Sequence, residues 1–304
     1  MPDDPLHELL LALCGALPKR DPPLMVVGGY GLVLRARYQR TASRQHPSTP
    51  WVRSTDDLDL LLGLELLASS DGAARLAGAI RQLGFIEHVP RMCFRRERTP
   101  GTPAVGIDLM APDPDRTRFP TLRVDANRVK AAVRGTVHGR RTEGAHLVLE
   151  APQRVTLGQG RAEVHLPTLF GFVVLKVLAY RDAVHATDAA VRARQGTHAA
   201  DLLVLCAGAE REEFDAACAA MHRHRHDPAI QEVRRVISAH FGAADASGTT
   251  SALAAVRESG GPMDVVDRMR ALEVLGYLER AGRTADNGND LGIRGKAGPG
   301  AGGG

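Results

Sequence analysis

The sequence predicts an α+β fold in which a half that mixes short strands and helices is followed by a helical half. Short apolar runs separated by glycine and proline turns fill the first half, as is typical of strands alternating with helices. From Pro167 onward, apolar residues recur at helical spacing to about residue 282. We therefore expect an α/β domain at 1–165, a helical domain at 166–283 and a disordered glycine-rich tail at 284–304.

Composition narrows the class of protein. The chain has 304 residues, of which 44% are hydrophobic and 24% charged, so it can bury an ordinary core. Its formal charge of +4 is compatible with a nucleic-acid partner without requiring one, and the low aromatic content of 4% leaves few stacking platforms. Four scattered cysteines without a CxxC pair indicate reduced thiols rather than a zinc site or disulfides.

The N-terminal segment is apolar but does not resemble a membrane span. No apolar run reaches the roughly 18 residues that a membrane-spanning helix needs. Asp3 and Asp4 stand where a signal peptide carries basic residues. Five leucines share one helical face, namely Leu6, Leu9, Leu10, Leu13 and Leu17. We expect an amphipathic first helix and a cytoplasmic protein that does not bind membranes.

The elements of the first half follow from their periodicity and turn signals. A strand is expected before the glycine turn at Gly28 and Gly29, a helix with a basic outer face over 31–40, and a proline-containing loop over 41–52. A helix is expected over 71–84, where alanines and leucines mark a packed face. Further short strands are predicted at 57–62, 85–89, 92–98, 104–111, 146–150 and 162–167.

Two helices matter most in the second half. The segment "PTLFGFVVLKVLAYRDAVH" predicts a long helix with Pro167 in its first turn, and "THAADLLVLCAGA" predicts the next helix. Lys176 interrupts the nearly continuous apolar face of the first of these helices. A buried lysine needs either a carboxylate partner or an anionic ligand, and both interpretations stay open.

The segment "RSTDDLDLLLG" carries three aspartates into an apolar strand. Side chains alternate along a strand, so Asp57 and Asp59 share one face while Leu58 and Leu60 share the other. Two neighbouring carboxylates repel each other, but a divalent cation between them makes the arrangement favourable. All-oxygen ligands suit Mg²⁺ or Mn²⁺. The alternative is a turn with exposed aspartates, which we expect for Asp56.

Two further features favour the metal interpretation. Asp108 stands alone between apolar residues in "GIDLMAP" and completes a three-carboxylate cluster if its strand lies beside the first. Gly28 and Gly29 lie between a strand and a helix, where backbone amides and the helix dipole favour a phosphate. The turn lacks both GK[ST] and GxGxxG, which argues against a Walker ATPase and a dinucleotide site.

In this combination the chain resembles the nucleotidyltransferases of the DNA polymerase β-like superfamily, and most of all the AbiEii/AbiGii type of toxin nucleotidyltransferase. The matching segments, in order over about residues 24–205, are "GGYGLVL", "RSTDDLDLLL", "GIDLM", "LKVLAYRD" and "HAADLLVL". The chain departs from the family at Tyr30, where many members have serine, and at Thr197 and His198, where Lys-Asp is usual.

The resemblance implies a nucleotidyltransferase-type mixed sheet followed by a helical domain, and it assigns roles to several residues. Asp57, Asp59 and Asp108 would bind Mg²⁺ or Mn²⁺, while Lys176 and Asp201 would complete the catalytic set. The nucleotide-binding candidates are Gly28, Gly29, Arg53, Thr55 and Lys176. For Arg53 the alternative is an ordinary ion pair, for Thr55 a turn cap, and for Lys176 a structural salt bridge with Asp201.

The expected activity is transfer of a nucleoside monophosphate from an NTP to an acceptor hydroxyl, with release of pyrophosphate. The resemblance implies the 3′ end of tRNA as acceptor and a translation-blocking toxin with a cognate antitoxin protein as partner. Basic clusters at 91–98 and 138–141, with the basic helix after the glycine turn, are candidates for contact with the RNA backbone. Alternatives are transfer to a small molecule or a protein side chain, and a catalytically degenerate binding module.

Overall fold

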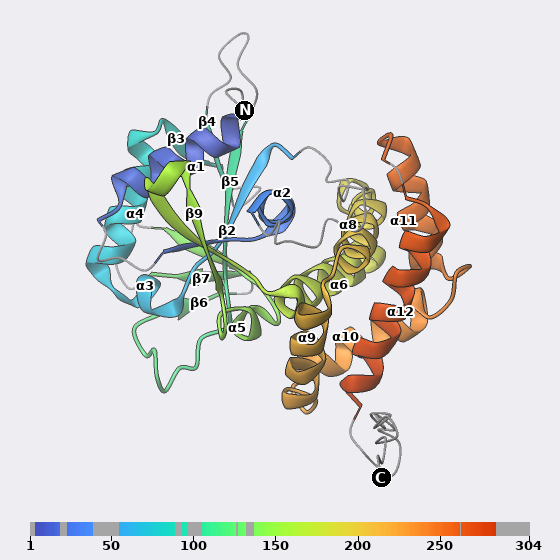
Figure 1. The fold of residues 1–304 in the computed structure, drawn as a ribbon. Helices are drawn as coiled ribbons and strands as arrows, with labels where there is room; N and C mark the ends of the chain where they lie inside the picture. The colour runs from blue at the N-terminus through green and yellow to red at the C-terminus, as the bar shows by residue number, and fades with distance from the viewer. Residues whose placement is uncertain are drawn as a thin grey trace, which may run out of the picture.

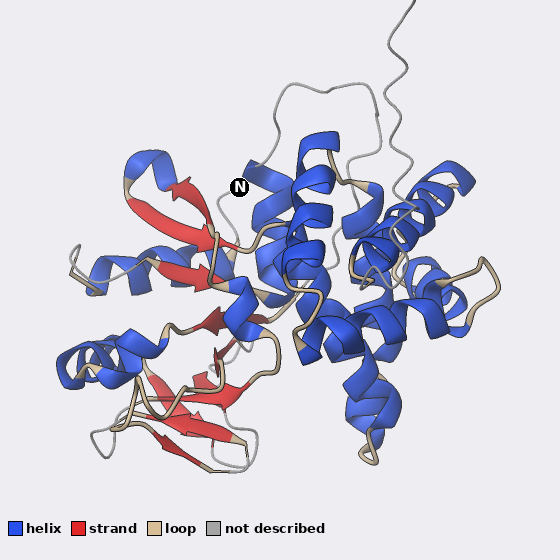
Figure 2. Ribbon diagram, turned by 90° about the horizontal axis from the view of Figure 1, so that it is seen from below, coloured by secondary structure: helices blue, strands red, loops and turns tan. Residues whose placement is uncertain are grey.

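The structure is a computed structural model that places its strands on one side and the helices of its second half on the other (Figure 1, Figure 2). It describes residues 4–18, 23–38, 55–88, 93–96, 105–125, 127–131, 137–261 and 263–283. The predicted loop over 41–52, the candidate Arg53 and the tail over 284–304 lie outside the described residues. Among the described helices, none is long and apolar enough to cross a membrane.

Within the described ranges, ten short strands form the sheet. They are β1 (Leu24–Val26), β2 (Asp57–Leu61), β3 (Phe85–His88), β4 (Cys93–Arg96), β5 (Gly106–Ala111), β6 (Arg123–Val124), β7 (Arg128–Lys130), β8 (His138–Arg141), β9 (Gln153–Leu157) and β10 (Ala162–Leu166). The strand order is β6-β7-β8-β5-β2-β1-β10-β9, with β4 joining β5 and β3 pairing with β4. Pairs β1–β10, β2–β5 and β5–β8 are parallel and the others antiparallel, so the fold is mixed α/β with a central mixed sheet, as predicted.

Helices flank this sheet and make up the second half. In the first part these are α1 (Pro5–Ala16), α2 (Gly28–Tyr38), α3 (Leu64–Ala68), α4 (Ser70–Gln82) and α5 (Ala145–Val148). In the second they are α6 (Leu169–His185), α7 (Ala189–Arg192), α8 (Gln195–Ala207), α9 (Arg211–Arg223), α10 (Pro228–Phe241), α11 (Ser247–Glu258) and α12 (Val265–Ala281). Helix α2 lies between β2 and the pair α6 and α8 (Figure 1).

Two hydrophobic clusters form the cores of the two parts. The first joins the leucines of α1, the inward side chains of the sheet and the apolar face of α4, and its last member is Leu166. The second surrounds α6, which packs against α8, α9 and α10. The second cluster takes most of its members from Leu169 onward, so the clusters divide beside the boundary predicted at residue 165. The division into separate domains stays a prediction.

Two local predictions were wrong. The segment 146–150 does not form a strand, because Gly144 adopts φ +71° and starts the short helix α5, whose Ala145, Leu147 and Val148 are buried. Pro167 is not in the first turn of α6. Helix α6 instead begins at Leu169, where the Thr168 hydroxyl caps it by accepting a hydrogen bond from the amide of Gly171 at 3.4 Å.

The basic outer face predicted for the helix after the glycine turn is also corrected. Arg35 is buried and forms a two-pronged ion pair with Glu213 of α9, with both N···O distances at 2.7 Å. Arg37 contacts Asp4, the residue that caps α1, at 3.0 Å. These arginines therefore hold helices together. Arg35 in particular ties α2 of the first part to α9 of the second.

We expect Arg35→Met to destabilise the protein by about 3 kcal/mol, because it leaves the largely buried Glu213 carboxylate without its partner. The matched control is Arg37→Met, where the more exposed pair with Asp4 predicts a loss of about 1 kcal/mol or less. Urea unfolding at pH 7 measures both values. Equal losses in the two variants would contradict the role given to Arg35.

Candidate active site

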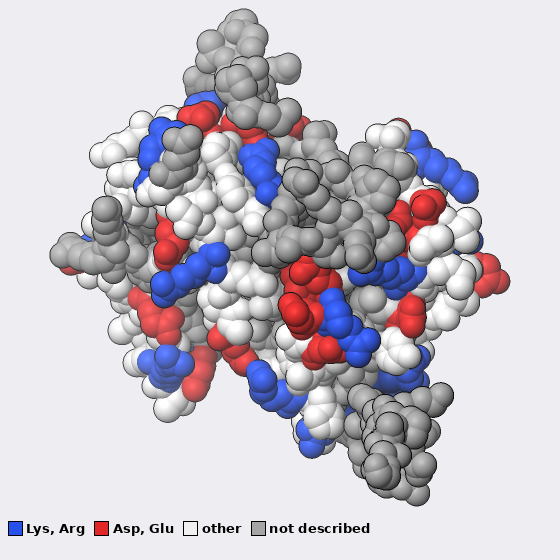
Figure 3. All heavy atoms as spheres, viewed as in Figure 1, with Lys and Arg blue, Asp and Glu red and all other residues white. Residues whose placement is uncertain are grey.

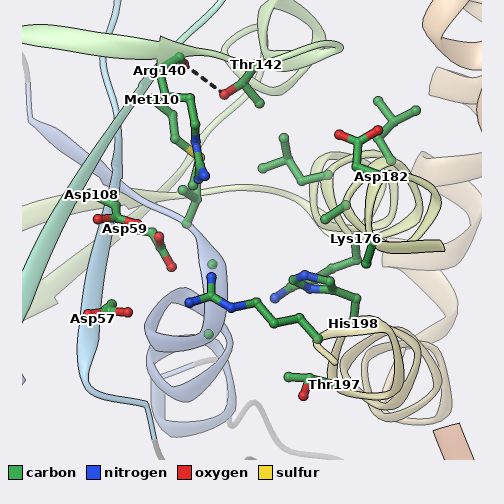
Figure 4. Close-up of a pocket in the computed structure, with 18 of the residues that line it drawn as sticks. Asp57, Asp59, Asp108, Met110, Arg140, Thr142, Lys176, Asp182, Thr197 and His198 are labelled. Carbon is green, nitrogen blue, oxygen red and sulfur yellow. Dashed lines mark hydrogen bonds between the residues drawn. The ribbon is translucent and has the colours of Figure 1, made fainter. Parts of the chain in front are cut away.

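Two parallel strands bring the three predicted aspartates to one face of the sheet. Leu58 and Leu60 of β2 are fully buried in the core, so Asp57 and Asp59 face the opposite way. Strand β5 pairs with β2 in parallel register, which places Asp108 directly beside Asp59. The three carboxylates lie near one another in Figure 4. The predicted third carboxylate is thus where the sequence pattern required it.

The glycine turn at Gly28 and Gly29 packs against strand β2. Gly28 begins α2 with φ +66°, and a Cβ atom there would lie 2.7 Å from the Cβ of Asp59, so a larger side chain has no room. The amide of Val27 donates a hydrogen bond to the carbonyl of Asp59 at 2.9 Å. These contacts bring the first turn of α2, whose amides have no partner within the helix, beside the carboxylates.

A cavity of about 520 Å³ lies between the sheet and the helices. The sheet and the glycine turn contribute Gly28, Gly29, Thr55, Asp56, Asp57, Asp59, Asp108, Met110 and Arg140. Helices α6 and α8 contribute Lys176, Thr197 and His198 on the opposite side, and Arg194 precedes α8 (Figure 4). The three predicted aspartates thus lie on one wall. The other wall carries the lysine of α6, the first turn of α8 and one further carboxylate, Asp182 of α6 (Figure 4).

Burial makes the carboxyl groups of Asp59 and Asp108 difficult to ionise. Desolvation, reinforced by the charge of Asp108, raises the pKa of Asp59 from 3.8 to about 6, against an opposing effect of Lys176 and Arg140. Desolvation also raises the pKa of Asp108, and the charge of Asp57 adds to it. The cations around the cavity offset only part of this penalty, so the site favours a further positive charge.

The residues fit a divalent cation at two of the three predicted ligands. One carboxylate oxygen of Asp108, Oδ1, is buried and has no hydrogen-bond partner among the described residues. Asp59, its register neighbour, carries the raised pKa that a cation would relieve. Asp57 instead contacts Arg95 at 2.5 Å. No group of three His, Cys, Asp or Glu side chains within the described ranges is arranged to hold a metal ion.

Lys176 and Asp201 form a buried ion pair between α6 and α8, with 2.7 Å from Nζ to Oδ2. Lys176 also lines the cavity, and its charge acts against the raised pKa of Asp59. The structural alternative considered for this pair is therefore present in the molecule. A phosphate contact by Lys176 stays a prediction, and Asp201 lies behind the lysine rather than in the cavity wall.

The other predicted residues around the site lie in different places, and of the two remaining nucleotide-binding candidates only Thr55 is among the described residues. The Thr55 hydroxyl donates a long hydrogen bond of 3.5 Å to the carbonyl of Asp57, at the mouth of β2. Asp56 is exposed, as expected, but it also lines the cavity. Thr197 and His198 both line the cavity. Arg53 lies outside the described residues.

Sequence reasoning assigned none of the three described arginines that line the cavity, Arg140, Arg141 and Arg194, to the site. Arg140 of β8 pairs in register with Met110 of β5, and its charge lowers the pKa of both Asp59 and Asp108 against their overall rise. Arg194 acts in the same direction on Asp108. The only signal for Arg140 was its place in the basic cluster at 138–141. Nothing in the sequence distinguished Arg194 from other surface arginines.

The basic clusters do not form one exposed surface in the described part of the chain. Arg95 contacts Asp57, Arg140 lines the cavity, and Arg141 forms an ion pair with Asp113. Figure 3 shows lysine and arginine interspersed with aspartate and glutamate over the described atoms of one face. Of the four described arginines in these clusters, Arg96 and Arg141 are exposed and Arg95 and Arg140 are partly buried. Contact with an RNA backbone stays a prediction.

Comparison with known proteins assigns no relative to this chain: no family model, no curated protein and no solved structure matches it. What can be said about function therefore rests on the residues and their geometry. The strongest feature is the parallel pairing that sets Asp59 beside Asp108 in the wall of a cavity.

We expect Asp59→Asn to stabilise the protein at pH 7.5 without divalent cations, by about 2 kcal/mol. The pKa of Asp59 in the folded protein, about 6, lies above its ordinary value of 3.8, so folding favours the protonated carboxyl group. The parent protein therefore loses stability as the pH rises from about 4 to 6. Asparagine does not ionise, so the advantage fades toward pH 4. Urea unfolding across this pH range checks it, with the exposed Asp56→Asn as control. A variant less stable than the parent at pH 7.5 would disprove the expectation.

Proposed function

We propose that the protein is a metal-dependent nucleotidyltransferase of the DNA polymerase β-like type, with its active site in the cavity beside β2 and β5. The observation that carries this proposal is the register of the two parallel strands, which sets Asp59 beside Asp108 with Asp57 on the same face. A glycine turn and the first turn of a helix adjoin these carboxylates. Carboxylates next to a phosphate-binding element suit transfer from a nucleoside triphosphate.

Asp59 and Asp108 would hold the divalent cation, and Asp57 is the third candidate ligand. When bound, Mg²⁺ or Mn²⁺ would neutralise phosphate charge and lower the pKa of the acceptor hydroxyl. The amides at Gly28 and Gly29 suit the triphosphate, because they lie in the first turn of α2. Arg140, Lys176 and Arg194 line the same cavity and add positive charge around the phosphates.

In the proposed reaction, the oxygen of the acceptor hydroxyl bonds to the α-phosphorus as the bond to the β-phosphate oxygen breaks. The hydroxyl proton passes to solvent water, and pyrophosphate leaves. The protein needs to supply only positioning and charge stabilisation for such a transfer. The proposed set of Asp57, Asp59, Asp108 and Lys176 with the glycine turn contains both kinds of group.

For the acceptor we propose the 3′ end of a tRNA, so that the protein acts as a translation-blocking toxin controlled by an antitoxin. This acceptor is supported by the resemblance of the five sequence segments and by the positive net charge. A small-molecule hydroxyl and a protein side chain are the competing acceptors. A degenerate binding module is disfavoured, since all three acidic positions are present.

The proposal predicts that the protein with Mg²⁺ transfers label from at least one α-labelled NTP to total tRNA. The double variant Asp57→Ala/Asp59→Ala should lose at least a thousandfold in rate, because both carboxylates that would hold the cation on β2 are gone. The control is Asp56→Ala, which removes a neighbouring exposed carboxylate and should keep most of the activity. Gel electrophoresis of the labelled products measures all three.

Each outcome of this assay separates the candidates. Label in tRNA that depends on Asp57 and Asp59 supports the proposed acceptor. Label in the protein itself would support a protein side chain as the acceptor, and label in an added aminoglycoside would support a small-molecule hydroxyl. If no NTP is consumed with any acceptor and the double variant binds nucleotide as well as the parent, the enzyme proposal fails.

We also expect Arg140→Met to raise KM for the NTP about tenfold, with a smaller effect on KM for the acceptor, because the lost guanidinium lies beside the carboxylate wall. Arg154→Met is the control, since Arg154 faces solvent on β9 and lies outside the cavity wall. Steady-state kinetics with varied NTP and then varied acceptor measures both constants. A change confined to KM for the acceptor would contradict the proposed role of Arg140 in nucleotide binding.

A further inference from the structure

A row of three residues crosses the sheet beside the proposed metal site. Asp57 of β2 pairs in register with Gly106 of β5, and Gly106 pairs in register with Arg95 of β4. Side chains directly opposite each other on neighbouring strands share a face of the sheet. Asp57 and Arg95 therefore point to the same side, two strands apart, with a glycine between them.

The glycine is what lets the two charged side chains meet. Nη1 of Arg95 lies 2.5 Å from Oδ1 of Asp57. A Cβ atom at Gly106 would lie 2.5 Å from Cζ of Arg95 and 2.6 Å from Oδ1 of Asp57, so any larger residue would overlap both partners. The amide of Gly106 also donates to the carbonyl of Asp56 at 3.1 Å, which fixes the strand edge where the pair forms.

The resulting ion pair is stronger than an ordinary surface contact. The side chains of Arg95 and Asp57 are only 29% and 25% exposed, so water screens their charges incompletely. Charge-assisted hydrogen bonds of this kind are shorter and stronger than neutral ones. A cation that takes Asp57 as a ligand must therefore displace the guanidinium or share the carboxylate with it.

We propose that Arg95 is a positioning residue that holds Asp57 across Gly106 and competes with the divalent cation for its carboxylate. The proposal rests on the proposed function, in that it takes the cavity carboxylates as the cation site. It assigns the three aspartates unequal parts. Asp59 and Asp108 are available to the cation without rearrangement. Asp57 becomes a ligand only when its contact with Arg95 breaks.

This competition has a measurable consequence, because removal of Arg95 releases Asp57 to the cation. Arg95→Met keeps the length and apolar stem of the side chain and removes the guanidinium. We expect it to tighten Mn²⁺ binding about tenfold, equivalent to about 1.4 kcal/mol. Arg96→Met is the matched control on the same strand, since Arg96 lies over the ring of Phe85 and points away from the acidic row. It should leave the Mn²⁺ affinity unchanged.

A second pair of variants separates competition for Asp57 from the general effect of removing a nearby positive charge. In an Asp57→Asn background the guanidinium has no carboxylate to hold, so adding Arg95→Met should no longer tighten Mn²⁺ binding. Titration calorimetry and electron paramagnetic resonance of free Mn²⁺ measure all five proteins without any substrate. Thermal unfolding without metal shows that each variant is folded before it is titrated.

The outcomes distinguish the two proposals. If the parent binds Mn²⁺ and Arg95→Met binds it with the same affinity, the role of Arg95 is disproved while the metal site stands. Equal tightening by Arg95→Met in the parent and in the Asp57→Asn background reduces Arg95 to a distant charge and also overturns the inference. If neither the parent nor Arg95→Met binds Mn²⁺, the metal site fails and the inference fails with it.

Discussion

The parallel pairing of β2 with β5 is the constraint on which the candidate site depends. Its register leaves Asp59 and Asp108 side by side and turns Leu58 and Leu60 into the core. A shift by one residue would bury the carboxylates among leucines, which the penalty for burying charge forbids. The apolar pattern that builds the sheet therefore also determines where negative charge collects.

The negative charge of the aspartates is partly neutralised by positively charged side chains, which interact with them to different extents. Arg95 contacts Asp57 directly, whereas Lys176 and Arg140 act on Asp59 only through their charge. Asp108 keeps a buried oxygen without a hydrogen bond among the described residues. An acidic wall left incompletely compensated in this way is typical of a site whose last partner is a ligand.

Both halves of the chain contribute to the cavity, so its geometry depends on how they pack. The carboxylates come from the sheet, while Lys176 and His198 come from α6 and α8. The largely buried pairs Arg35–Glu213 and Lys176–Asp201 tie helices together, and Lys176 also lines the cavity. Both pairs serve packing, since each joins helices and satisfies a charge that packing has removed from water.

The sequence by itself determined the alternation of short strands and helices, the first helix, the long helix after Pro167 and the shared face of Asp57 and Asp59, because each follows from local periodicity. The mixed sheet was expected only from the family resemblance. The sequence also singled out Asp108, and named the Lys176–Asp201 pair as one of two interpretations. Only the tertiary structure decided that Asp108 lies beside Asp59, that Arg95 reaches Asp57 across Gly106, and that Arg35 is buried. It also showed that residues 145–148 form a helix, where a strand was predicted over 146–150. These features depend on which strands and helices become neighbours, and pairing between distant segments leaves no periodic trace in a single sequence.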